Sequence, residues 1–162
     1  MLTVSTDDYL WFVDIALGAM VSILDRLGDV DANRRPQLDG TNSPYAIVTH
    51  CLGVIEFWGG HAVAGRRVER DRDAEFRAEG QVAELRERAV RARRQLEADL
   101  STLDPVATPR GALGPADADL PLGRTQGGVL LHVLEELFQH LGQLELSRDV
   151  LMAARAAGPH PD

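Results

Sequence analysis

The chain has 162 residues, 44% of them apolar, which fits one domain with a hydrophobic core, and its formal charge is −8. All 17 basic residues are arginine, which excludes a lysine nucleophile, a lysine base and a P-loop lysine, and the acidic balance disfavours nucleic acid as a partner. The single cysteine, Cys51, excludes an intrachain disulfide and any multi-cysteine metal site, so polar chemistry falls to five histidines, the carboxylates and one thiol.

The first predicted helix runs from about Thr6 to Gly28. Thr6 can cap its first turn, two aspartates follow where the helix dipole favours negative charge, and Gly28 can end it. Apolar residues recur at spacings of three and four, which is the pattern of one buried helical face. A polar loop is predicted over residues 29–42.

The second predicted helix runs from Pro44 to about Gly65. Ser43 can accept hydrogen bonds from the free amides of the first turn, and Pro44 stands at the first helical position, where no donor is needed. Interior glycines cost a helix roughly 1 kcal/mol each relative to alanine. They therefore indicate close packing against a neighbouring helix or a ligand; they are Gly53, Gly59 and Gly60.

Two further helices are predicted over residues 81–103 and from about 125 to 157. The charge-dense stretch 66–77 is interpreted as a solvated surface connection. Residues 104–124 are rich in Pro, Gly and Ala, and a loop this long is typical of a lid, a binding loop or a disordered strip. The sequence therefore predicts an all-α four-helix bundle with one long crossover loop, formed by a single domain over 1–157 with a tail at 158–162.

The N-terminus has no basic region followed by an apolar run, so no signal peptide is predicted. Charged residues such as Asp14 and Glu56 interrupt the longest apolar stretches, and none is expected to cross a bilayer. We therefore expect a cytoplasmic protein with no membrane partner.

The last predicted helix carries polar residues where a core face is expected. His132, Glu136 and His140 are spaced four apart, which places them on one face of a helix, where such pairs can share a metal ion. Joined by a histidine of the second helix, either His50 or His61, such a pair would form a His2Glu site with one open position. That donor set is typical of catalytic zinc.

Ordinary structural roles compete with these interpretations. A histidine on an amphipathic helix is more often a hydrogen-bonded side chain than a ligand, and His61 is better placed at the surface or behind the ligands. Cys51 is better interpreted as a small buried hydrophobe than as a reactive thiol.

Several stretches of the sequence together resemble the DinB-like metal-dependent superfamily of four-helix bundles. They are Asn42 to His50, the Glu135–Glu136 pair followed by His140–x–Gly–Gln, the segment from Gly53 to Phe76, and Leu144 to Asp149. Within the superfamily, the resemblance is closest to the actinobacterial branch of mycothiol S-transferases and mycothiol-dependent maleylpyruvate isomerase, and it covers most of the chain from Leu10 to about Leu151.

This resemblance implies a ligand set. Superfamily members usually use three histidines, whereas the mycothiol-linked branch uses a His/Glu/His triad, which falls on His50, Glu136 and His140 here. His132 lies one turn earlier, as a group behind the ligands or facing the substrate. The isomerase carries an additional C-terminal domain that a chain of this length would not contain, so the resemblance favours thiol transfer.

The leading hypothesis is a metal-dependent S-transferase that joins a low-molecular-weight thiol, mycothiol first, to a small electrophile through a metal-bound thiolate. Zn²⁺ is the expected ion and Ni²⁺ the alternative, and the protein is expected to be a monomer or a homodimer. A small metal-dependent hydrolase and a non-catalytic metal- or ligand-binding bundle are the competing hypotheses.

Overall fold

The structure is a computed structural model that describes residues 3–118 and 120–157, so the predicted tail 158–162 lies outside the described residues. All regular secondary structure in the described part of the chain is helical, which confirms the all-α prediction. The elements in chain order are α1 (Thr6–Ala32), α2 (Pro44–Val54), the π-helix η1 (Ile55–Val63), α3 (Arg72–Glu75), α4 (Val82–Asp99), the 3₁₀-helix η2 (Leu100–Thr102), α5 (Pro115–Ala118), α6 (Pro121–Arg124) and α7 (Gln126–Ala157).

Helix α1 begins as predicted but with a different cap. Ser5, rather than Thr6, accepts the hydrogen bond from the backbone amide of Asp8, at 3.0 Å. Gly28 kinks the helix with a φ of 68°, a left-handed conformation that favours glycine, and helical turns then continue to Ala32. The predicted loop is therefore shorter at its start than the sequence indicated.

The second helical segment begins as predicted, because the Ser43 side chain accepts from the backbone amide of Ala46 at 3.2 Å. It does not continue as one α-helix, because residues 55–63 form the π-helix η1. A Cβ added at Gly59 would collide with Leu96 of α4 and one at Gly60 with Arg66, so both glycines permit close packing. Gly65, with a φ of 74°, follows the end of this segment.

Residues 44–63 are the one helical stretch in the described part of the chain that is long and apolar enough to cross a membrane, and 83% of its most apolar window is buried inside the protein. Length and composition alone therefore do not distinguish this stretch from a core helix. The prediction that no stretch would be long enough overlooked it, because Glu56 is a single charge within a run of apolar residues.

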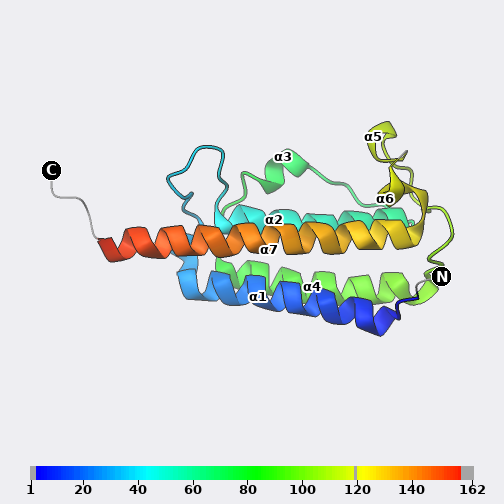
Figure 1. Cartoon of the computed structure of the whole chain (residues 1–162), viewed down its shortest axis with the longest axis horizontal. Helices are drawn as coiled ribbons and strands as arrows, with labels where there is room; N and C mark the ends of the chain where they lie inside the picture. Colours follow the sequence, from blue (N-terminus) through cyan, green and yellow to red (C-terminus); the bar gives the residue numbers. More distant parts are fainter. Residues whose placement is uncertain (1–2, 119, 158–162) are drawn as a thin grey trace.

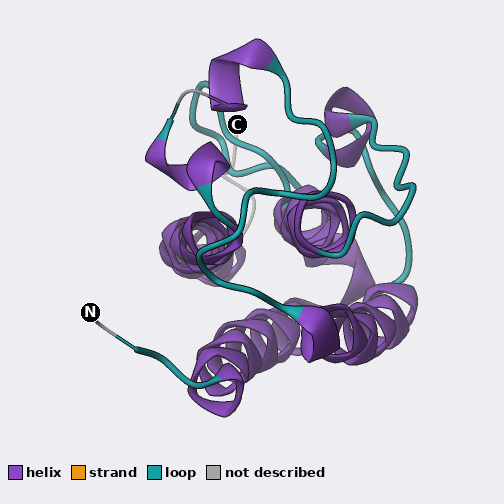
Figure 2. Ribbon diagram, turned by 90° about the vertical axis from the view of Figure 1, so that its right-hand side faces the viewer, coloured by secondary structure: helices purple, strands orange, loops and turns teal. Residues whose placement is uncertain are grey.

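The four long helical segments lie side by side in two layers, with α2–η1 and α7 in one and α1 and α4 in the other (Figure 1). The short helices α3, α5 and α6 lie on the outer side of the α2–α7 layer, away from α1 and α4, as Figure 2 also shows. The buried core between the layers is formed by residues from all four segments, such as Met20, Ile47, Leu96 and Leu144. The α2–α7 layer is thus covered by connecting segments on one face.

Residues 104–124 are not a structureless strip, because they contain α5 and α6 and are tied to the helices beside them. The buried Gln126 donates to the backbone oxygen of Thr108 at 3.1 Å, and the backbone amide of Arg110 donates to Ala62 at 2.8 Å. These bonds anchor the connection at the end of the molecule where η1 ends and α7 begins.

Candidate metal centre

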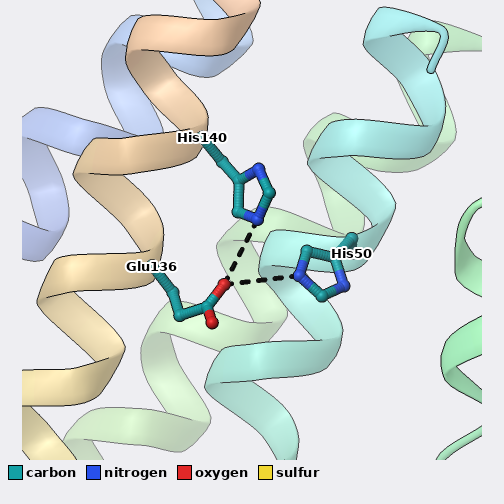
Figure 3. A group of neighbouring side chains, drawn as sticks. All are labelled: His50, Glu136 and His140. Atoms are coloured by element: carbon teal, nitrogen blue, oxygen red, sulfur yellow. Dashed lines mark ion pairs between the residues drawn. The ribbon is translucent and has the colours of Figure 1, made fainter. Parts of the chain in front are cut away.

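Helices α2 and α7 bring together the three residues that the resemblance implied as ligands. The Nε2 atom of His140 lies 3.2 Å from Glu136 Oε2, and the Nε2 atom of His50 lies 3.5 Å from the same oxygen (Figure 3). One ligand atom from each of the three residues lies within 4.8 Å of the others. Figure 3 shows the three side chains pointing toward one another across the space between the two helices.

The other ring nitrogen of His50 is held by a buried carboxylate. Its Nδ1 lies 2.8 Å from Oε2 of Glu75, and because an ionised carboxylate only accepts, Nδ1 carries the proton and donates. Arg70 binds Glu75 with two hydrogen bonds, of 2.7 and 2.9 Å. The Nε2 of His50 is buried and has no hydrogen-bond partner among the described residues, so its lone pair is free on the side facing Glu136.

His140 is oriented in the same way by a neutral group. Its Nδ1 donates to Oε1 of Gln143, one turn later on α7, over 2.9 Å. Its Nε2 is therefore also left as the acceptor nitrogen, on the side of Glu136. Both histidines thus present Nε2 to one carboxylate while Nδ1 is tied elsewhere, which is the arrangement that metal-ligating histidines show in proteins.

The electrostatics of the site keep its carboxylates ionised. When no ion is bound and the Nε2 atoms carry protons, hydrogen bonds from His140 and then His50 hold the pKa of Glu136 far below its usual range, despite the opposing effect of burial; a bound ion would take the place of these protons. Burial raises the pKa of Glu75, but His50 and Arg70 more than offset this, so that it too is lowered. Burial lowers the pKa of His50, whereas the nearby carboxylates of Glu136 and Glu75 raise it, with a net increase.

These donors fit a divalent metal ion. Bonds of about 2.0–2.1 Å in tetrahedral geometry place ligand atoms roughly 3.3–3.4 Å apart, close to the two distances measured here. The free Nε2 of His50 is a buried polar atom that an ion would satisfy. Two imidazoles and one carboxylate leave one position open on a four-coordinate ion and are a donor set that zinc favours.

His132 lies beside this trio on α7. Its Nε2 is 3.6 Å from the other oxygen of Glu136, its Nδ1 is 3.0 Å from Glu135, and its ring packs edge-on against Trp58 at 4.9 Å. His132, Glu135 and Glu136 form a second group with metal-ligand spacing, but Glu135 has 58% of its side chain exposed. The four-residue periodicity therefore placed His132 on the correct face.

His61 and Cys51 are not members of this group. Both ring nitrogens of His61 face backbone oxygens, Nδ1 that of Arg66 at 3.2 Å and Nε2 that of Ala112 at 3.0 Å. The side chain of Cys51 is fully buried, and burial raises the pKa of its thiol. Of the two histidines that spacing alone left open in the second helix, the structure brings only His50 to the trio.

The sequence analysis missed Arg70 and Glu75. It interpreted residues 66–77 as a solvated connection, yet Glu75 is 8% exposed and contacts His50. The one available signal was Gly53, where an added Cβ would overlap the Glu75 carboxylate. That glycine was assigned to close packing, but nothing in its spacing indicated which residue it faces.

Comparison with known families adds an independent finding. The DinB superfamily profile matches residues 13–144, which include the trio and the residues that hold it. The chain belongs to the DinB superfamily. Members of this superfamily often bind metal, in agreement with the donor set described above. No curated protein and no solved structure gives a significant match to this DinB-superfamily chain.

Proposed function

We propose that this DinB-superfamily protein is a metal-dependent thiol S-transferase built on a four-helix bundle, with His50, Glu136 and His140 as the metal ligands. The observation that carries the proposal is the pair of histidines whose Nδ1 atoms are tied and whose Nε2 atoms face one carboxylate. Zinc is the ion we propose, with nickel as the alternative. When bound, the ion supplies positive charge that holds a thiol sulfur as the thiolate at neutral pH.

The sulfur in this proposal comes from a small molecule. The only cysteine, Cys51, is fully buried and its thiol pKa is raised, so the chain offers no accessible thiolate of its own. No lysine is present to act as an alternative nucleophile. We propose mycothiol as the thiol, in line with the resemblance to the actinobacterial mycothiol-linked branch, and the cytoplasm as the compartment that supplies it.

In the proposed reaction a new carbon–sulfur bond forms to the electrophile, a leaving group departs with its electron pair, and the thiol proton is released. We propose that His132 accepts that proton. It is held by Glu135 and Trp58 and lies one turn from the ligands, with 15% of its side chain exposed. Glu136 does not take this role, because it is one of the three proposed metal ligands.

The test is conjugation by the metal-loaded protein. Zinc-loaded protein is incubated with mycothiol and monochlorobimane, and with glutathione or bacillithiol in parallel. We expect fluorescent conjugate with mycothiol, loss of it in His140→Ala, and little change in His61→Ala, whose ring lies outside the trio. No conjugate above the metal-free background with any thiol contradicts thiol transfer.

Two other outcomes separate the competing functions. The same ligand set could instead activate water, and release of product from an ester panel without added thiol would favour a small metal-dependent hydrolase. If the purified wild-type protein contains no stoichiometric divalent metal, and His50→Ala does not change its metal content, both the transferase and the hydrolase hypotheses are contradicted. A non-catalytic bundle is then favoured. Size-exclusion chromatography of the same sample distinguishes the monomer from the homodimer.

A further inference from the structure

We propose that Arg70 and Glu75 are positioning residues that set the orientation and donor strength of His50, so that the connection between η1 and α4 controls metal affinity. This inference rests on the proposed metal site. It concerns residues outside the ligand trio, on a segment that the sequence marks only as charged.

The contacts of Glu75 define the direction of the His50 ring. Its Oε2 receives the Nδ1 proton of His50 at 2.8 Å, and the Arg70 guanidinium grips both carboxylate oxygens. With Nδ1 fixed as the donor, only Nε2 can bind an ion, and it faces Glu136 at 3.5 Å. A histidine without this partner could rotate or adopt the other tautomer, in which Nε2 carries a proton and binds no metal.

The face of the ring is held by the next residue of the same segment. Phe76 stacks on His50 with ring centroids 4.4 Å apart, and the guanidinium of Arg72 lies 5.1 Å from the Phe76 ring centroid. The segment therefore holds His50 at its edge through Glu75 and at its face through Phe76. Contacts of both kinds oppose ring rotation when no ion is bound.

The burial of Glu75 indicates that its contact with His50 has a structural role, unlike a solvated surface charge. Its side chain is 8% exposed, and a buried carboxylate is costly unless charged partners offset its desolvation. The chain makes room for it with Gly53, because any Cβ at that position would overlap the carboxylate. An exposed acidic residue on a connecting loop would need neither charged partners nor a glycine opposite it.

The two histidine ligands differ in the charge of their partners. His140 is held by the neutral amide of Gln143, whereas His50 is held by an ionised carboxylate. A carboxylate on Nδ1 raises the basicity of the opposite nitrogen, and loss of such partners typically weakens metal binding by about 10–100-fold. His50 is therefore the ligand whose donor strength depends most on a group outside the trio.

The experiment compares two arginine–glutamate pairs that border the same cavity of about 260 Å³, of which Arg70–Glu75 is the more buried and Arg88–Glu56 is partly exposed. Glu75→Gln removes the charge beside His50. Glu56→Gln is the matched control, because Glu56 also forms two hydrogen bonds to an arginine, Arg88, at 3.0 and 2.7 Å, without touching a ligand histidine. Metal-free proteins are titrated with Zn²⁺ in competition with a chromophoric chelator, and visible spectra are recorded with Co²⁺.

We expect Glu75→Gln to weaken Zn²⁺ binding by about 10–100-fold and to change the Co²⁺ absorption bands. Glu56→Gln is expected to stay within about threefold of the wild type, since that pair lies outside the ligand environment. Wild-type affinity in Glu75→Gln overturns the inference, and so does equal weakening in both variants, which would indicate general destabilisation.

A second variant keeps the test decisive if Glu75→Gln does not fold. Gly53→Ala retains every polar group and improves helix propensity, but its methyl group must displace the Glu75 carboxylate. We expect weaker Zn²⁺ binding of the same order, and unchanged affinity in this variant overturns the inference. Wild-type protein that fails to bind zinc overturns the proposed metal site together with it, whereas a wild type that binds while both variants match it overturns the positioning role alone.

Discussion

The continuous helical segment formed by α2 and η1 carries two histidines with opposite environments, His50 near its start and His61 near its end. Both rings stack on a phenylalanine, His50 on Phe76 at 4.4 Å and His61 on Phe57 at 5.1 Å. The nitrogens of His61 both face backbone oxygens, whereas His50 has one nitrogen tied to a carboxylate and the other without a hydrogen-bond partner among the described residues.

This difference separates a structural histidine from a candidate ligand by its partners rather than by its burial. His61 connects the end of η1 to the 104–124 connection, and its nitrogens are engaged in doing so. His50 keeps one lone pair directed at Glu136, a group that can bind the same ion. An exchangeable ion could bind the free lone pair of His50, whereas both nitrogens of His61 already face backbone oxygens.

The largest expected effect comes from removing a ligand of the trio. His140→Ala should weaken divalent metal binding by more than about 100-fold, because losing a ligand costs more than losing an outer partner. His61→Ala should leave metal stoichiometry unchanged. Metal content after dialysis, measured by inductively coupled plasma mass spectrometry, checks both; equal loss of metal in the two variants would erase the distinction between the histidines.

For the stability of the metal-free protein, we expect His61 to be the important histidine. His61→Ala should lower the free energy of unfolding by about 1–3 kcal/mol, since the change removes the contacts to the Arg66 and Ala112 oxygens and the Phe57 stack. Urea denaturation of the metal-free protein measures it, with hydrogen exchange reporting on residues 110–112. A variant as stable as the wild type would show that His61 does not anchor the connection.

A smaller effect is expected from the neutral partner of His140. Gln143→Leu removes the acceptor for Nδ1 and should weaken Zn²⁺ binding by roughly 10-fold, the lower end of the range for outer partners. Chelator competition measures this, with Gln139→Leu, an exposed position on the same helix, as the control. Unchanged affinity in Gln143→Leu would mean that helix packing alone orients His140.

The smallest expected effect concerns a second buried atom without a hydrogen-bond partner, one that belongs to neither group with metal-ligand spacing among the described residues. The Tyr9 hydroxyl is, like Nε2 of His50, buried without a hydrogen-bond partner among the described residues, and burial raises the pKa of this tyrosine. Tyr9→Phe removes a desolvated hydroxyl and should be neutral or stabilising by up to about 1 kcal/mol. Thermal melts measure it, and marked destabilisation would reveal a hydrogen bond to an ordered water.

The sequence predicts much of this molecule because helix periodicity and capping are local. The second helix starts at Pro44 beside the Ser43 cap, and the face shared by Glu136 and His140 follows from their four-residue spacing. The role of Glu75 could not be predicted, because it depends on where the connection that contains α3 packs against α2. Spacing left both His50 and His61 open; the residues around His61 favoured a position at the surface or behind the ligands, and the family resemblance then selected His50.

The relative directions of His50 and His61 around the second helix also could not be predicted from the sequence. On a regular α-helix, residues eleven apart lie within about 20° of one face, which would place His50 and His61 on the same side. The π-helix η1 begins between them and changes the rotation per residue, so this relation fails. Within η1, Gly59 closely approaches Leu96 of α4 and Gly60 closely approaches Arg66, which are tertiary contacts that periodicity alone does not encode.

The close approach of Glu75 to Gly53 has a consequence for how sequences of this kind diverge. Because a Cβ at position 53 overlaps the carboxylate, the two positions are not free to change independently. A homologous chain with a larger residue at the position of Gly53 should also have lost the acidic residue at that of Glu75. The pair should therefore covary, and the identity of one helix residue should reveal whether a carboxylate stands behind the first histidine.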